Sequence, residues 1–260
     1  MTMKFDVFGK RENPVIVMLT GSFCAGPCLE YLYTKLCDDY YVIVPTYNGL
    51  YEGSGDFTTR QNEVKLIADY IVNENIHSVR MVYGQSMGGE VGAELVKQLL
   101  NRGVKVENAV FDGAPMIKLS RAYKAFMRFK FNTIIRLAKT KSVDDVMNMS
   151  IIKQLGGSKI STLKPMLEDV AAVAPYISKQ TIKNQVECCY TFDFPVMSEE
   201  MQKNMYFLYG AEEKAYKTCF KGVKKAYPHA NYKVEDGHGH MTFSVEHTDA
   251  YVEMLKNISK

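Results

Sequence analysis

The sequence lacks any segment suited to entering a membrane. Its first residues, "MTMKFDVFGKRENP", contain no apolar core of the kind found in a signal peptide. No later apolar run approaches the roughly 20 residues that a membrane-spanning helix needs. We therefore expect no stable membrane insertion and a cytoplasmic location.

A large excess of charge of one sign is also absent. The formal net charge is +3 over 260 residues, which is too small to indicate nucleic-acid binding by the whole protein. The chain has no phosphate-binding loop and no dinucleotide fingerprint, because the glycines in "EGSGD" do not directly follow a predicted strand. It contains no internal repeat. We expect a protein that works without nucleic acid and without a cofactor.

The six cysteines form no recognisable framework of disulfides or metal ligands. Without a secretion signal they are more typical of free thiols. Cys24 and Cys28 have a spacing that zinc permits, but the adjacent Cys188 and Cys189 cannot easily share one ion. The histidine pair in "HGH" (238–240) has no third ligand in the sequence. We therefore predict no metal.

What the sequence does contain is an alternation of strand and helix patterns. Buried strands are predicted at four apolar, β-rich runs: 13–20, 40–47, 77–84 and 107–114. Helical spacing follows the first three of them, at 28–40, at 58–72 and after residue 86. Buried strands separated by helices are typical of a mostly parallel sheet with helices on both faces. The chain therefore belongs to the α/β class.

The alternation stops at about residue 116 and resumes near residue 201. Two further strand patterns then alternate with two helical patterns, of which the last is at 248–258. The simplest account is one α/β core, made of residues 1–115 and 201–260, with a mainly helical insertion at 116–200.

The segment "YGQSMGG" places Ser86 between glycines where a predicted strand meets a predicted helix. It fits the pattern G-x-S-x-G of a nucleophile elbow, in which small neighbours let the strand and the helix approach closely. The helix N-terminus and the amide of Met87 point to where an oxyanion would form. The alternative is a glycine-rich turn with a capping serine.

A catalytic serine needs a base, and the base needs an orienting carboxylate. Downstream, "LYGAEE" places Glu212 and Glu213 just after a predicted strand, and "GHGH" places His238 and His240 just after the next. The order serine, acid, histidine is that of the α/β-hydrolase arrangement. All three groups would lie at the carboxyl ends of parallel strands, where such sheets bind ligands.

With these motifs, the chain resembles the α/β-hydrolase-fold serine hydrolases of the small bacterial type that carry a helical cap. The resemblance rests on "MLTGSF", "YGQSMGG", "FDGAP", "LYGAEE" and "GHGH", and it covers essentially residues 4–258. It implies the α/β-hydrolase fold, with residues 116–200 as the cap. It also implies catalysis through an acyl-enzyme, without a cofactor.

The chain departs from the usual family pattern at two places. The family has His-Gly-X after its first central strand, with the amide of X as the second oxyanion donor. Here "TGSF" follows that strand, so the role falls to the backbone of Ser22, with Phe23 as a competing assignment. The usual acid is an aspartate, whereas spacing favours Glu213 here. Asp112 is an alternative because some hydrolases of this fold take the acid from that earlier strand, and Glu212 is another.

Both candidate histidines resemble the Gly-His pair of the family. The family often has about seven residues between its histidine and the start of the last helix. Counting back from "HTDAYVEML" therefore favours His240 and leaves His238 as a loop histidine.

The insertion begins with a basic amphipathic pattern at 117–141 that contains no acidic residue. Tyr123, Phe126 and Phe129 fall on one face of the predicted helix, and we expect them to approach Ser86 across a pocket. The basic face is either a solvated surface or a contact for an anionic lipid surface or substrate.

The sequence thus predicts a serine hydrolase of a small acyl substrate, first of all a carboxylic ester, with Ser86, His240 and Glu213 as its triad. Thioesters, amides or peptides, and carbon–carbon bonds are the alternative targets of the same triad. A ligand-binding protein that keeps the hydrolase scaffold is the alternative from another class. The sequence does not set the oligomeric state.

Overall fold

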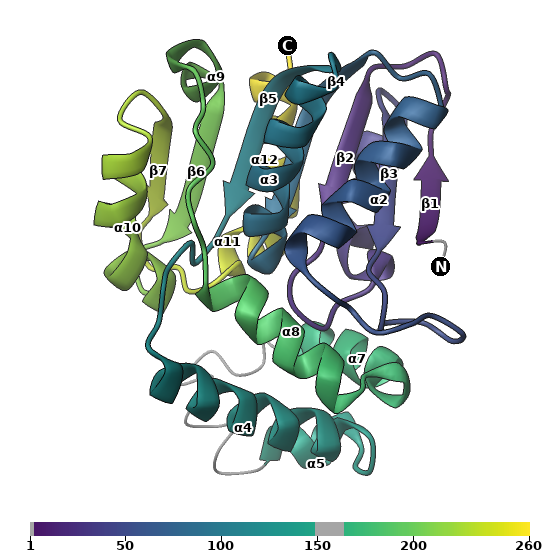
Figure 1. The fold of residues 1–260 in the computed structure, drawn as a ribbon, viewed down its shortest axis with the longest axis vertical. Coiled ribbons are helices and arrows are strands. Elements are labelled where there is room, and N and C mark those ends of the chain that lie inside the picture. The colour runs from purple at the N-terminus through teal and green to yellow at the C-terminus, as the bar shows by residue number, and fades with distance from the viewer. Residues whose placement is uncertain (1–2, 149–163) are drawn as a thin grey trace.

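The apolar runs of the sequence become the strands of one sheet. The computed structural model describes residues 3–148 and 164–260. Their strands are β1 (Lys4–Phe8), β2 (Val15–Leu19), β3 (Tyr41–Thr46), β4 (Ser78–Gln85), β5 (Lys105–Asp112), β6 (Met205–Gly210) and β7 (Asn231–Glu235). Figure 1 shows them side by side in the order β1-β3-β2-β4-β5-β6-β7. Every neighbouring pair is parallel except β1 with β3, so the predicted mostly parallel sheet is confirmed.

The edge strand β1 is absent from the sequence prediction. It pairs antiparallel with β3, from Lys4 opposite Thr46 to Phe8 opposite Val42. Its five residues are only half-buried or exposed, because no strand lies beyond it. A run of only five residues that includes a lysine and an aspartate does not stand out as a strand in the sequence.

Each central strand is buried on both faces, and its side chains alternate between two apolar layers. In β2, Val15, Val17 and Leu19 belong to one core cluster, and Ile16 and Met18 belong to the other. The first layer is closed by helices α2 (Arg60–Asn73), α3 (Met87–Asn101) and α10 (Lys214–Ala226), and the second by α1 (Glu30–Leu36) and α12 (Thr248–Ile258). Figure 1 shows α2 and α3 in front of the sheet and α12 behind it. Three short helices complete the core: η1 (Gly26–Leu29), α9 (Glu199–Lys203) and α11 (Thr242–Glu246).

Between β5 and β6 the chain leaves the sheet and forms helices. Within the described residues these are, before α9, helices α4 (Arg121–Ala138), α5 (Val143–Asn148), α7 (Lys164–Val173), η3 (Ala174–Tyr176) and α8 (Lys179–Tyr190). The hydroxyls of Ser120 and Ser178 begin α4 and α8 by accepting backbone N–H groups of the first turn. Figure 1 shows α4, α5, α7 and α8 together beyond the carboxyl ends of the strands, and α8 packs on both α3 and α4. These helices therefore lie at the edge of the sheet where the elbow serine is placed.

The rotation of α4 about its axis differs from the prediction. Phe126 and Phe129 are 57% and 71% exposed, whereas Met127 and Ile135 are buried. Neither phenylalanine packs in the core, and the approach of Tyr123, Phe126 and Phe129 to Ser86 across a pocket stays a prediction. Apolar side chains occur on more than one side of this helix, and the sequence alone does not show which side packs against the core.

The basic residues around α4 are partly neutralised by acidic partners. Lys124 Nζ lies 2.5 Å from Oε2 of Glu187 on α8 and 2.7 Å from the hydroxyl of Thr191. Lys118 pairs with Asp193. These contacts attach α4 to α8 and to the segment after it. A contact between the remaining basic face and an anionic surface or substrate stays a prediction.

Two further features concern the chain as a whole. No helix within residues 3–148 and 164–260 has the length and apolar character that a membrane crossing requires. All six cysteines have free thiols, as expected, and four of them are buried. Buried thiols pack as small apolar side chains.

One carboxyl group is fully buried in the first turn of α3. Oε1 of Glu90 accepts the backbone N–H of Met116 at 2.8 Å, and its Oε2 has no hydrogen-bond partner among the described residues. Burial raises the pKa of Glu90 to about 8, although backbone hydrogen bonds and the charge of Arg60 oppose the rise. The folded protein therefore holds this carboxyl group protonated at neutral pH.

We predict that Glu90→Gln flattens the pH dependence of stability. Between the ordinary pKa of 4.5 and about 8, Glu90 is protonated in the folded chain and ionised in the unfolded chain, so rising pH favours unfolding. Each pH unit in this window costs up to about 1.4 kcal/mol of unfolding free energy. Urea unfolding at several pH values across this window measures the free energy of unfolding. Relative to that of the parent protein, the free energy of unfolding of Glu90→Gln should increase as the pH rises.

The exposed Glu200 supplies the control for this experiment. The free energy of unfolding of Glu200→Gln should change with pH in the same way as that of the parent protein. Stability curves that run parallel for the parent and for Glu90→Gln would contradict the raised pKa.

Candidate active site

The elbow serine has a backbone conformation that few residues adopt. Ser86 lies between the last residue of β4 and the first of α3, with φ at 52° and ψ at −121°. Strand and helix come so close that a β-carbon at Gly84 would lie 2.2 Å from the carbonyl oxygen of Gly88. A β-carbon at Gly88 would lie 2.3 Å from the carbonyl oxygen of Leu19. The contacts of the turn therefore require both glycines of G-x-S-x-G.

The loop that follows β2 passes directly beside Ser86. A β-carbon at Gly21 would lie 3.3 Å from Cβ of Ser86. The hydroxyl of Thr20 donates to the carbonyl oxygen of Cys24 at 2.7 Å and so holds the loop together. Where the family resemblance leads one to expect histidine, this chain thus uses a side chain that bonds within the loop.

The backbone N–H groups near Ser86 differ in whether they already have a hydrogen-bond acceptor within the protein. Met87 is the first residue of α3, so its N–H has no acceptor inside the helix. The N–H of Phe23 donates to Oε1 of Gln185 on α8 at 2.9 Å. Because that donor is already bonded, Phe23 is less available than Ser22 for the expected oxyanion contact, and the role of Ser22 stays a prediction.

The helices between β5 and β6 hold this loop from the other side. Oγ of Ser22 lies 3.2 Å from Sγ of Cys189 on α8, and the ring of Phe23 lies 5.1 Å from the ring of Phe131 on α4. Gln185 is absent from the sequence prediction. It meets Phe23 across 162 positions of the chain, and no local motif marks it.

His240 connects Ser86 to a carboxylate. Its Nε2 lies 3.1 Å from Oγ of Ser86, and its Nδ1 lies 2.5 Å from Oε2 of Glu213. With the proton on Nδ1, Nε2 is free to accept the serine proton. The ring lies against Gly113, where a β-carbon would be 2.7 Å from two ring atoms. The glycine of "FDGAP" therefore leaves the space that the imidazole occupies.

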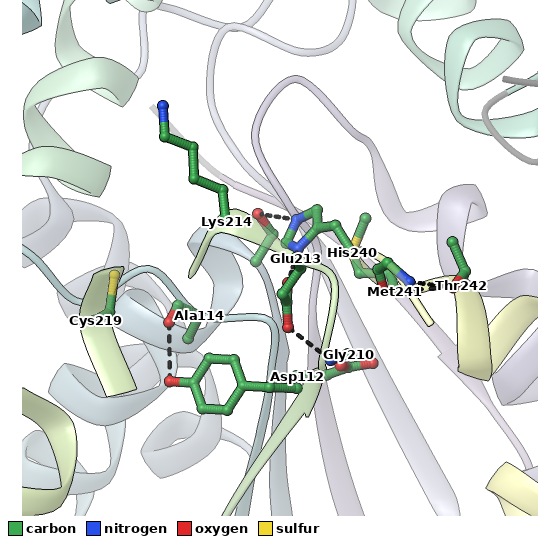
Figure 2. A network of polar contacts seen from close by, with 12 residues as sticks. Asp112, Ala114, Gly210, Glu213, Lys214, Cys219, His240, Met241 and Thr242 are labelled. Atoms are coloured by element: carbon green, nitrogen blue, oxygen red, sulfur yellow. Dashed lines mark hydrogen bonds and ion pairs between the residues drawn. The ribbon is translucent and has the colours of Figure 1, made fainter. Parts of the chain in front are cut away.

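Glu213 lies at the N-terminus of α10 and uses both of its carboxylate oxygens. Oε2 accepts from His240, and Oε1 accepts the backbone N–H of Gly210 at 2.9 Å. Figure 2 shows Glu213 between these two partners. The side chain of Glu213 is only 1% exposed, whereas Glu212 is exposed to solvent. The structure therefore brings Glu213, and not Glu212, to the imidazole.

Asp112, the alternative acid, lies nearby at the end of β5 but has another partner. Its Oδ2 accepts the hydroxyl of Tyr251 at 2.8 Å. Burial raises the pKa of Asp112 to about 7, and the neighbouring charge of Glu213 adds to the rise. The carboxyl group of Asp112 is thus close enough to affect His240 electrostatically, but its hydrogen bond goes to Tyr251.

Opposing effects set the pKa of His240. Desolvation of the ring lowers it, while the hydrogen bond to Glu213 and the negative charges of Glu213 and Asp112 raise it. The net pKa lies above the ordinary 6.5, although 39% of the side chain is exposed. His240 can accept a proton from a serine only above this pKa, where the ring is neutral.

His238 lies apart from this constellation. Its Nδ1 is 3.4 Å from Oε2 of Glu246 and 3.4 Å from the hydroxyl of Thr242. Its ring contacts those of Phe243 and His247. Of the two candidate histidines, His240 is the one that the structure brings within hydrogen-bond distance of Ser86.

Comparison with known proteins identifies the fold. No protein-family model matches the chain, and no curated protein sequence matches it. An alpha/beta hydrolase family protein from Desulfitobacterium hafniense superposes with a TM-score of 0.76 at 14% identity, over 99% of this chain and 100% of the other. A marine microorganism esterase gives 0.72 at 16% identity, over 99% of both chains. MenH from S. aureus gives 0.68 at 17% identity, over 99% of this chain and 97% of the other.

These full-length likenesses establish that the chain has the α/β-hydrolase fold, as the sequence predicts. At identities of 14–17% they establish the fold alone. The similar proteins carry different names, and one fold supports many reactions. The reaction has to be argued from the site.

We predict that Glu213→Gln lowers the pKa of His240. The substitution removes the negative charge beside Nδ1, and the new amide would donate to Nδ1 and leave the imidazole proton on Nε2. The NMR signals of the His240 ring should therefore titrate at lower pH than in the parent protein. Glu212→Gln removes an exposed neighbouring charge and should change the titration far less. Equal pKa values in the parent and in Glu213→Gln would contradict the ion pair.

Proposed function

We propose that this protein is a serine hydrolase that cleaves a small acyl substrate, first of all a carboxylic ester. One observation carries the proposal: a single imidazole lies within hydrogen-bond distance of both Ser86 and the buried Glu213. Such a relay activates a hydroxyl that is otherwise a weak nucleophile. The esterase among the structures with this fold supports the choice of an ester.

In the first half of the proposed reaction, Oγ of Ser86 attacks the ester carbonyl while Nε2 of His240 takes its proton. Glu213 holds the Nδ1 proton and stabilises the imidazolium. The carbonyl oxygen becomes an oxyanion that the amides of Met87 and Ser22 stabilise. The imidazolium then gives its proton to the leaving alkoxide, so the alcohol departs and the acyl group stays on Ser86.

In the second half, water replaces the alcohol. Nε2 of His240 takes a proton from the water, whose oxygen attacks the acyl carbonyl, and the same amides hold the second oxyanion. Collapse of this intermediate breaks the bond to Ser86, which recovers its proton from the imidazolium. The products are a carboxylic acid and the free enzyme, and no cofactor takes part.

We extend the proposal to the helices of residues 116–200 as a cap over the site. Gln185, Cys189 and Phe131 from these helices contact the loop that carries Ser22. A cap that touches the oxyanion loop is well placed to select the acyl group. The six free thiols support a cytoplasmic location.

Thioesters, amides or peptides, and carbon–carbon bonds remain alternative substrates of the same relay. A panel of p-nitrophenyl esters, thioesters and aminoacyl amides, assayed under one set of conditions, would rank them. Fastest turnover of a thioester or an amide would replace the ester in the proposal and keep the mechanism.

We predict that Ser86→Ala abolishes both ester turnover and labelling by a fluorophosphonate probe. The probe reacts quickly only with an activated serine, so it also separates an enzyme from a ligand-binding protein on the same scaffold. Thermal unfolding should show that the variant stays folded. Ester turnover at the parent rate in Ser86→Ala, or a parent protein that is never labelled, would defeat the proposal.

The two histidines provide a matched pair for a second prediction. His240→Ala should cost about a thousandfold or more in turnover, as loss of a triad base does. His238→Ala should cost much less, because its ring bonds to Thr242 and Glu246. Both rates should be measured with the ester that the parent enzyme cleaves fastest. The reverse result, with His238→Ala inactive and His240→Ala active, would transfer the role of base to His238.

Asp112→Asn tests the acid in the same assay. If Asp112→Asn abolished turnover and Glu213→Gln left it unchanged, the acid would have to come from β5. The hydrogen-bond partners favour the opposite result, with Glu213→Gln the more damaging substitution.

A further inference from the structure

Three side chains that can bind a metal ion meet on the far side of the histidine loop. They are His238 in the loop, Glu246 at the end of α11 and His247 at the start of α12. One ligand atom of each lies within 4.8 Å of the others. In the sequence, the pair His238 and His240 has no third ligand. In the structure, His238 has two other candidate ligands beside it, Glu246 and His247, and His240 does not belong to this set.

The chemistry of this set is that of zinc. Two histidines and one glutamate form one of the ligand sets that zinc enzymes use, with water in the remaining position. Ligand atoms about 2.1 Å from a tetrahedral ion lie about 3.4 Å from each other. Nδ1 of His238 and Oε2 of Glu246 are already 3.4 Å apart. The ligand atom of His247 lies within 4.8 Å of the other two and would have to move closer to complete the triangle.

Two of the three ligands are accessible from solvent. Glu246 and His247 are exposed, so an ion can reach them from solvent. The side chain of His247 makes no capping hydrogen bond at the start of α12. The hydroxyl of Thr242 lies at 3.4 Å from Nδ1 of His238, a long contact that a metal bond can replace.

We infer that His238, Glu246 and His247 form a binding site for a divalent transition-metal ion, Zn²⁺ above all, outside the catalytic triad. The bound ion would join the loop that carries His240 to the junction of α11 and α12. We expect the bound ion to make this loop more ordered and to raise the melting temperature of the protein. No catalytic step passes through it.

The test is calorimetric titration of the chelator-treated, full-length protein with Zn²⁺. The parent protein should bind one equivalent and melt at a higher temperature when it is loaded. Glu246→Gln and His247→Ala should each weaken binding by about tenfold or more, since even partners outside the first shell of a metal have effects of that size. Both side chains are exposed, so neither substitution should disturb the fold.

Two controls separate this site from other zinc ligands. His229 faces Glu199 at 3.9 Å in an exposed pair that has no third metal ligand among the described residues, so His229→Ala should leave the affinity unchanged. Cys28 and Cys37 are the cysteines that are not fully buried, and the double variant Cys28→Ser, Cys37→Ser should also bind one equivalent. Titration with Co²⁺ adds a spectroscopic check, because thiolate ligands give intense charge-transfer bands and imidazole and carboxylate ligands do not.

The outcomes are distinct. Three results would overturn the inference. They are Zn²⁺ binding that survives in the double variant Glu246→Gln, His247→Ala, thiolate bands in the cobalt spectrum, and a parent protein that binds no Zn²⁺. Ser86→Ala should bind zinc like the parent protein. Failure of the proposed hydrolase activity would therefore leave the metal site standing, and failure of the metal site would leave the hydrolase proposal standing.

Discussion

The backbone turn at Ser86 is the constraint around which the rest of the site is arranged. A φ of 52° is costly for a residue with a side chain, and such strain persists only where the surroundings impose it. They impose it here through the N–H of Ser86, which donates to the carbonyl oxygen of Asp112 at 2.8 Å, and through the contacts that require Gly84 and Gly88. The turn presents the hydroxyl at the carboxyl edge of the sheet and places the amide of Met87 at a helix N-terminus beside it.

Hydrogen bonding also distinguishes the two carboxyl groups near His240. Glu213 receives two N–H donors, one from the imidazole and one from Gly210, an arrangement that stabilises a carboxylate. Asp112 receives phenol hydroxyls, from Tyr251 and from Tyr83, and burial raises its pKa to about 7. The two carboxyl groups therefore differ in the kind of donor that they receive, and of the two only Glu213 is hydrogen-bonded to the imidazole. Both lie at strand ends, so position in the sheet does not separate them.

The sequence predicted those parts of the molecule that local patterns determine. Strands buried on both faces appear in the sequence as continuous apolar runs, which predict the sheet. The tight turn at Ser86 requires glycines, and the G-x-S-x-G pattern therefore predicts it. The half-exposed strand Lys4–Phe8 left no such run. The side of α4 that packs inward and the bond from Gln185 to Phe23 depend on contacts between distant segments, which no local pattern records.

The histidine loop is the clearest case of backbone geometry deciding chemistry. In an extended backbone, His238 and His240 would point the same way, because they are two residues apart. Positive φ angles at Gly237 (72°) and Met241 (58°) mark turns on either side of the pair, and in this loop one ring faces Ser86 while the other faces Glu246. A loop that must hold His240 within hydrogen-bond distance of the serine gains from any contact that reduces its motion. Its second histidine lies where the proposed metal contact would form away from Ser86, so the proposed metal site and the proposed catalysis can be tested separately.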